Sequence, residues 1–176
     1  MNFTDYVDKN YNFKLDDQQI NKIIEKIKKY VDTKENIYVA GCGGSGYTAS
    51  HFVQDLIKVC GANAKSLSEP NGLLSAISND IGFDQVFQFQ LERLNQGLLI
   101  VFSYSGNSES IINATLYALK NNFDVISFTG MGGKLKSIKH RNKLNININN
   151  INIYVVESIH SILCHFIINV LEGNIE

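Results

Sequence analysis

The chain has 176 residues, a formal net charge of −1 and 44% hydrophobic residues. A chain of this length folds as one domain and removes roughly 68–70% of its unfolded surface from water, which excludes a second domain. The near-neutral charge argues against a general nucleic-acid binder, which needs a basic face that contacts several phosphates.

The first predicted element is a helix over residues 16–31, where isoleucines recur at helical spacing after Asp17, which can cap the first turn. A β-rich run at residues 36–40 leads directly into the glycine turn GCGGSG. A second helix follows the turn, with an apolar face made of Ala49, Phe52, Val53, Leu56 and Ile57. This first third of the chain therefore predicts a helix and then a strand, a glycine turn and a helix.

The rest of the chain repeats this alternation. A weak strand at 64–68 precedes two helices at 72–78 and 83–94, and the apolar run at 98–102 is typical of a buried parallel strand. It ends in SYSGNSES and a helix with the apolar face Ile111, Ile112, Thr115, Leu116 and Leu119. The remaining predictions are a strand at 124–128 ending in TGMGGK, a solvated basic loop at 134–143, a strand at 144–154 and a helix at 155–171.

Strands that alternate with helices predict an α/β fold, a three-layer doubly wound parallel sheet whose ligands bind at the carboxyl ends of the strands. We expect a single domain over residues 1–176, with an N-terminal helical arm at 1–34 and a ligand-binding core at 35–176.

The cysteines and the N-terminus indicate a cytoplasmic protein. Cys42, Cys60 and Cys164 are odd in number and widely spaced, so reduced thiols are expected. The start of the chain lacks the pattern of a signal peptide, and we find no run of about 20 apolar residues that could cross a membrane.

Three predicted strands end in Gly/Ser loops: GCGGSG, SYSGNS and TGMGGK. In the second loop Ser103, Ser105 and Ser108 precede a helix, where free N–H groups and the helix dipole favour a phosphate. A serine cradle without a lysine suits a phosphate monoester. The alternative is a serine-rich turn that only caps its helix.

The turn Gly41-x-Gly43-x-x-Gly46 also satisfies the dinucleotide fingerprint, and Glu69 lies roughly where a ribose-binding acid would follow the second strand. Against this reading, the chain has no room for a second catalytic domain, and Ser45 supplies a hydroxyl that a dinucleotide turn does not need.

Ionisable residues gather on two predicted helices. His51 and Asp55 are four residues apart and share a helix face, and Glu157 and His165 interrupt the apolar last helix. Two imidazoles and two carboxylates are suitable ligands for Zn²⁺, and they are equally suitable as an acid/base pair. Cys42 lacks a neighbouring base and is interpreted as a packing residue.

Together these motifs resemble the sugar isomerase (SIS) domain family, and within it the phosphoheptose isomerases. The resemblance covers roughly residues 36–172 and rests on GCGGS, His51-Phe52, Asp55, SLSEPNGLLSAISNDIGFDQVF, SYSGNS, TGMGGK and the ESIH segment that leads to His165. It implies a flavodoxin-like sheet and isomerisation of sedoheptulose 7-phosphate, which supplies heptose for lipopolysaccharide. It also implies a divalent metal, expected to be Zn²⁺ with no nucleotide cofactor, and a homotetramer with sites between subunits.

The resemblance also assigns roles to residues. Asp55 and His165 would be catalytic, and the metal ligands would be His51, Asp55, Glu157 and His165. The substrate would contact Cys42, Gly43, Gly44, Ser45, Asn79, Asp80, Ser103, Tyr104, Ser105, Ser108 and Glu157.

The chain departs from the family pattern at several of these positions. The family's usual Asn is Cys42, its catalytic Glu is Asp55, its Gln is Glu157, and the Thr of its serine loop is Tyr104. Asp55 shortens the reach of the base by one methylene, which costs rate unless it is compensated. An alternative function is therefore a catalytically altered SIS protein that binds a sugar phosphate or a protein partner, like the replication-initiator-associating type.

Overall fold

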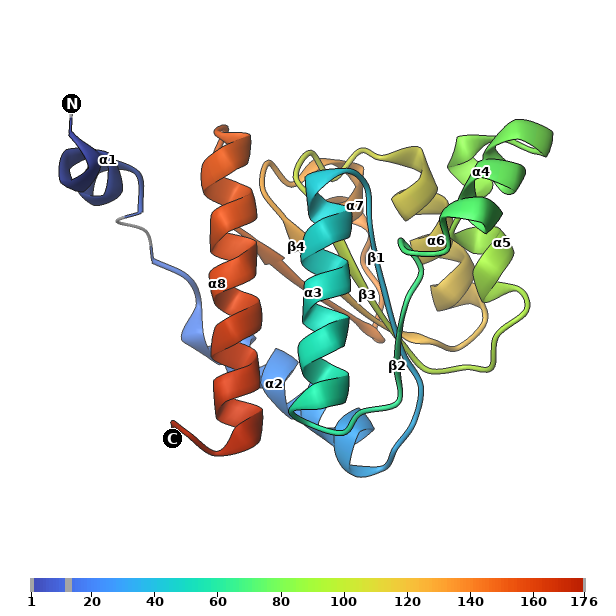
Figure 1. The fold of residues 1–176 in the computed structure, drawn as a ribbon, viewed down its shortest axis with the longest axis horizontal. Coiled ribbons are helices and arrows are strands. Elements are labelled where there is room, and N and C mark those ends of the chain that lie inside the picture. Colours follow the sequence, from blue (N-terminus) through green and yellow to red (C-terminus); the bar gives the residue numbers. More distant parts are fainter. Residues whose placement is uncertain (1, 12–13, 176) are drawn as a thin grey trace.

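The computed structural model describes residues 2–11 and 14–175. Figure 1 shows a central sheet with helices packed against it and α1 standing apart near the N-terminus. The elements in chain order are α1 (Phe3–Asn10), α2 (Asp17–Asp32), β1 (Ile37–Gly41), α3 (Gly44–Lys58), β2 (Ala64–Ser66), α4 (Asn71–Asp80), the 3₁₀ helix η1 (Phe83–Gln85), α5 (Gln88–Leu91), β3 (Leu98–Ser103), α6 (Glu109–Lys120), β4 (Asp124–Thr129), α7 (Gly133–Ser137), β5 (Lys143–Asn147) and α8 (Ile153–Glu172).

The five strands form one parallel sheet in the order β2-β1-β3-β4-β5. This is the flavodoxin-like order, and it confirms the predicted doubly wound α/β fold. The order reverses between β1 and β3, so the carboxyl ends of these two strands open the crevice in which such sheets bind ligands. The first two Gly/Ser loops follow these two strands.

Alternate strand residues point to two separate cores, because successive side chains of a strand face opposite sides of the sheet. Ile37 and Val39 pack into a core with α2, α3 and α8, and Tyr38 and Ala40 pack into a core with α4 to α7. The sheet is therefore the middle of three layers. In Figure 1, α8 (red) and α3 (cyan) lie side by side, and α4, α5 and α6 form a separate group.

The ends of several helices differ from the prediction. Asp16, not Asp17, caps α2, because its carboxylate accepts hydrogen bonds from the backbone N–H groups of Gln18 and Gln19. The last helix starts earlier than predicted, since the side chain of Asn152 caps it by accepting from the N–H of Tyr154.

Two predicted elements are shorter than the sequence pattern suggested. The strand predicted at 144–154 ends at Asn147, because Asn149 has a φ of 57° and breaks the extended conformation before α8 begins. The helix predicted at 83–94 divides into η1 and α5. Val86 and Phe87, between the two, and Leu91 of α5 are buried, while Phe83 stays half exposed.

Some side chains also differ from the prediction. Ile57 and Leu116 lie at the margins of their helices and are 48% and 50% exposed instead of belonging to the apolar faces. The segment 134–143 is not a fully solvated loop, because α7 buries Leu135 in the core and burial lowers the pKa of Lys143 to about 8.

The helix α8 corrects the expectation that no segment could cross a membrane. By length and composition alone it is apolar enough to do so, but 44% of that stretch is buried inside the structure. It contributes Val155, Ile159 and Ile167 to the core shared with α3, and each of these side chains is fully buried. A core helix of a globular domain meets the same criterion, so this helix is weak support for a membrane segment.

Candidate active site

The carboxyl ends of β1 and β3 enclose a pocket of about 170 Å³. Its lining is Cys42, Ser45, Phe102, Ser103, Tyr104, Ser105, Ser108, Ile153 and Glu157. Most of these residues are substrate contacts predicted from the sequence, and they come from two glycine loops and the start of α8. The crevice expected from the strand order is therefore lined with hydroxyl groups.

The serines of this pocket have different structural roles. The hydroxyl of Ser103 accepts from the N–H of Gly106 at 3.2 Å, and that of Ser105 accepts from the N–H of Asn107 at 3.1 Å, so both brace the turn. Ser108 occupies the N-cap position of α6, but its side chain makes no capping hydrogen bond. A turn that only caps its helix does not explain Ser108, whose hydroxyl lines the pocket at the start of α6.

Gly106 joins the serine loop to the third glycine loop. It has a φ of 65°, and a Cβ at this position would collide with the backbone oxygen of Gly132. The side chain of Asn107 reinforces the junction by accepting from the N–H of Lys134 at 3.0 Å. The loop TGMGGK therefore supports the pocket from behind, and none of its residues is among the lining residues.

The start of α3 faces the same pocket. Gly43 has a φ of 56° and no side-chain cap follows it, so the first N–H groups of the helix have no side-chain acceptor. A Cβ at Gly44 would lie 2.5 and 2.6 Å from the two carboxylate oxygens of Glu157, so this carboxylate packs directly on the helix start. The positive end of the α3 dipole stabilises a negative charge there.

A second cluster lies farther along α3 and α8. The Nε2 atom of His51 is 3.5 Å from Oδ2 of Asp55, and the rings of His51 and His165 meet edge to face with centroids 5.1 Å apart. One ligand atom from each of the three residues lies within 4.8 Å of the other two. Asp55 is mostly buried in this His–Asp–His triad, and both imidazoles are exposed.

The triad fits a Zn²⁺ ion by the chemistry of its donors. Two imidazoles and one carboxylate are a common catalytic zinc set that leaves a coordination position for water or substrate. Cys164 borders the same cleft but is not part of the donor group formed by the triad, and burial and the charge of Asp55 raise the pKa of its thiol. The structure brings together three of the four predicted metal residues, and Glu157 lies in the serine pocket instead.

The other predicted site residues occupy separate places. Asn79 and Asp80 are exposed at the end of α4, where the amide of Asn79 donates to the carboxylate of Asp80, and neither lines the serine pocket or the triad cleft. Tyr104 lines the serine pocket, and its hydroxyl donates to the backbone oxygen of Ile151 in the segment before α8. Burial raises the pKa of Cys42, which agrees with a packing role.

Two hydroxyl-bearing residues of the triad cleft were not among the predicted site residues. Thr48 lies one helical turn before His51, and Ser161 lies one turn before His165, and both line the cleft. The helical period relating each hydroxyl to its histidine could have identified them.

Comparisons with known proteins identify a family and several similar proteins. A family model described as SIS domain matches residues 7–130. Two curated relatives named phosphoheptose isomerase, from Helicobacter pylori (strain P12) and Sulfurimonas denitrificans, are 34% and 38% identical to the chain over 125 residues. Each match covers 65% of this chain, and the chain spans 65% and 64% of the length of the two relatives, slightly under two thirds.

A solved structure gives the same result for the fold. The phosphoheptose isomerase of Neisseria gonorrhoeae is similar with a TM-score of 0.83 and 27% sequence identity, over 89% of this chain and 86% of that chain. The two chains therefore share their fold over most of their length.

Proposed function

The chain belongs to the SIS domain family, and we propose that within this family it interconverts sedoheptulose 7-phosphate and D-glycero-D-manno-heptose 7-phosphate. The names of the relatives support the heptose substrate. The serine pocket supports a phosphate monoester, and the triad supports proton transfer.

One observation carries this proposal: the same two helices connect the serine pocket to the triad. Helix α3 carries Ser45 at the pocket and Asp55 in the triad, and α8 carries Glu157 and then His165. Eight residues of helix separate Glu157 from His165, which is a rise of about 12 Å. An extended sugar phosphate anchored in the pocket can therefore place its carbonyl end beside the triad.

Aldose–ketose isomerisation moves one proton between C1 and C2. A base removes the proton from C1 of the ketose while O2 gains a proton, which gives an enediol. The proton is then delivered to C2 while O1 loses its proton and the carbonyl forms at C1. We assign the proton transfers to Asp55 and His165, which face each other across the cleft. The serine hydroxyls and the N–H groups at the start of α6 hold the phosphate and keep the chain of the sugar aligned.

His51, Asp55 and His165 would hold the metal, which we propose is Zn²⁺. When bound, the ion would polarise the oxygens of C1 and C2 and stabilise the charge that develops on them. Glu157 adds a carboxylate beside a phosphate site, and we infer that it gives the pocket a weaker affinity for phosphate than a neutral amide would give.

The decisive experiment measures turnover of sedoheptulose 7-phosphate by NMR in the same sample in which the metal content is determined. We expect conversion that depends on stoichiometric zinc. No turnover with or without added zinc overturns the isomerase proposal. Binding of the sugar phosphate without turnover supports the alternative of a catalytically altered SIS protein, which Asp55 and Glu157 make the second candidate.

A variant tests whether Asp55 limits the rate. Asp55→Glu restores the longer carboxylate typical of the family, and we expect it to raise the catalytic rate. A lower rate would show that the cleft has adapted to the shorter side chain.

We also propose a cellular location, an oligomeric state and a biosynthetic role for the protein. By resemblance to the family we expect a cytoplasmic homotetramer that supplies heptose for lipopolysaccharide, with active sites between subunits. Sedimentation of the active protein tests this expectation, and an active monomer would contradict it.

A further inference from the structure

A further cavity in the described part of the chain lies outside the serine pocket and the triad. It has a volume of about 370 Å³ and lies between the ends of β1 and β2, the start of α3, and the segment from α4 to η1. Only Cys42 lines both this β1–β2 cavity and the serine pocket. Apart from Gly43, a predicted substrate contact, the proposed isomerase chemistry uses none of the other residues that line it. Its size is typical of a small-molecule site.

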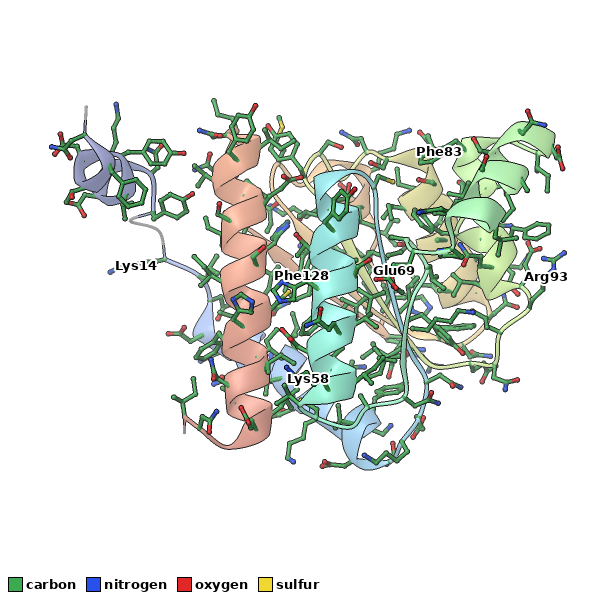
Figure 2. All side chains as sticks on the ribbon, viewed as in Figure 1. Lys14, Lys58, Glu69, Phe83, Arg93 and Phe128 are labelled. Atoms are coloured by element: carbon green, nitrogen blue, oxygen red, sulfur yellow. The ribbon has the colours of Figure 1, made fainter. Side chains whose placement is uncertain are left out.

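The charged group of the β1–β2 cavity is the carboxylate of Glu69, and Asn71 is a further polar residue of its lining. Glu69 lies just after β2, and Figure 2 shows it next to α3. The two neighbouring serines are already paired, Ser68 with the backbone of Gly41 and Ser50 with Ser66. Within residues 2–11 and 14–175, no hydrogen bond or ion pair engages the Glu69 carboxylate, so both of its oxygens are available to hydroxyl donors on a ligand.

The walls of the cavity are apolar and aromatic. Phe87 is buried at the back, and the rings of Tyr47 and Phe83 are 83% and 54% exposed. Tyr47 belongs to α3, and Phe83 begins η1, the element that follows α4 in the chain. Figure 2 shows Phe83 beside α4. Exposed aromatic rings at a cavity bind the flat face of a base or the apolar face of a sugar ring by stacking.

The charges of the cavity exclude an anionic ligand. Lys and Arg are absent from the described lining residues, and Glu69 contributes a negative charge. On the other side of the glycine turn, the carboxylate of Glu157 already packs against the start of α3, where a dinucleotide would place its pyrophosphate. The site therefore lacks the features that would hold a nucleotide phosphate, and a neutral ligand fits it.

The backbone of α3 lies close to the backbone at the end of β1, beside the cavity. A Cβ at Gly46 would lie 2.9 Å from the backbone oxygen of Gly41, so α3 packs tightly against the end of β1. In doubly wound sheets, an acidic residue after the second strand binds the hydroxyls of a ribose placed over such a turn. The position of Glu69 meets this requirement.

From these observations we infer that the β1–β2 cavity is a second small-molecule site, which takes an uncharged ring bearing a vicinal cis diol. The two hydroxyls donate to the Glu69 carboxylate, and the ring system stacks against Phe83 and Tyr47. Two sources carry this chemistry: the ribose of a nucleoside, and a pyranose with a cis diol. Because the cavity does not contain the triad, occupation of this site is separate from isomerisation.

The test is calorimetric titration of the full chain with four neutral probes. These are adenosine, 2′-deoxyadenosine, methyl α-mannopyranoside, which has a cis diol, and methyl α-glucopyranoside, whose hydroxyls are all trans. We expect saturable binding of adenosine or of the mannoside, and at least about tenfold weaker binding of the matching probe without the cis diol. Binding of adenosine identifies a nucleoside source, and binding of the mannoside alone identifies a sugar source.

Variants locate the site. Glu69→Gln keeps the shape of the side chain and should weaken the binding of the diol probe about tenfold. Glu25→Gln changes an exposed acid on α2 and should leave that binding unchanged, and so should His165→Ala in the triad. The inference is overturned if none of the probes binds up to about 10 mM, or if Glu69→Gln binds the diol probe as tightly as the unchanged chain.

Discussion

The serine pocket and the His–Asp–His triad are built in different ways. The pocket is shaped by backbone at the ends of β1 and β3, and glycines such as Gly43 and Gly106 supply conformations with positive φ. The triad is placed by side chains that project from two regular helices, with Asp55 one turn beyond His51 on α3. The pocket therefore depends on local loop conformation, and the triad depends on the packing of α3 against α8.

The serine pocket and the triad should therefore respond differently to amino-acid substitutions. A side chain removed from the triad leaves its helices intact, because the cores behind them are made of other residues. A changed backbone in the loops distorts the pocket itself, since Cys42, Tyr104 and Ser105 line it from these loops. Substitutions in the triad should therefore act on chemistry, and substitutions at loop glycines should act on folding and binding together.

The largest expected effect is on the triad. His165→Ala removes a proton-transfer group and should lower kcat by about 10³-fold while the affinity for inorganic phosphate changes little. The measurement is steady-state turnover, with phosphate binding followed by calorimetry. His140→Ala, in an exposed loop, is the matched control and should retain full turnover. Equal losses of turnover and of phosphate affinity would show that the two regions are not separable.

The next effect concerns the loop junction. Gly106→Ala combines a positive φ with a collision against Gly132, so we expect a loss of about 3 kcal/mol in the free energy of unfolding. Urea denaturation measures it. Gly72→Ala is the control, because a Cβ there meets nothing within 4 Å and should be neutral or stabilise the helix slightly. Equal stability of the two variants would contradict the proposed junction.

The buried His160 gives a smaller effect that depends on pH. Its ring packs against Phe102 and Phe128, which stack on each other, and neither ring nitrogen has a hydrogen-bond partner among the described residues. Burial lowers the pKa of His160 from 6.5 to about 4, and the backbone of Thr129 opposes this only in part, because it makes no hydrogen bond of good geometry with the ring.

The sign of this effect follows from the depressed pKa. Below pH 6.5 the unfolded chain binds a proton that the folded chain does not, so His160 removes about 2–3 kcal/mol of stability as the pH falls from 6.5 to 4. His160→Leu should remove this contribution and flatten the decline in the free energy of unfolding over that range. Urea denaturation at several pH values tests this, and identical pH dependence of the two proteins would rule it out.

The smallest effect concerns one hydroxyl of the pocket. Ser108→Ala should raise KM for the sugar phosphate about tenfold with kcat nearly unchanged, because the residue binds phosphate and takes no part in proton transfer. Ser75→Ala, on the exposed side of α4, is the control and should leave KM unchanged. A large fall in kcat instead would place Ser108 at the reacting end of the substrate.

The sequence was sufficient to predict most of the fold and part of the site. The alternation of apolar strands and amphipathic helices predicted the parallel sheet, and the spacing of His51 and Asp55 predicted their shared face. Periodicity could not reveal that Asn149 interrupts the last strand, because a positive φ depends on the path that the chain takes to α8.

The sequence could not predict where Glu157 lies relative to the triad, for a similar reason. Helical spacing relates it to His165 along α8, but its separation from the triad depends on how α8 lies against the start of α3. The contact of its carboxylate with Gly44 is tertiary, and no local pattern encodes it. The β1–β2 cavity likewise could not be predicted, because three segments distant in the sequence form it. The sequence did identify Glu69 as an acidic residue after the second strand.

Because α3 and α8 both extend from the serine pocket to the triad, they fix the distance between the phosphate and the carbonyl end of the substrate. One helical turn shifts a side chain by about 5.4 Å, whereas one carbon added to a sugar shifts its carbonyl by much less. A preference for a shorter or longer sugar therefore cannot arise by moving the histidine at position 165 to another position on α8. The smallest move that keeps it on the same helix face is about one turn, which exceeds the length that one carbon adds. In this architecture, a change of chain length must come from the loops that hold the phosphate.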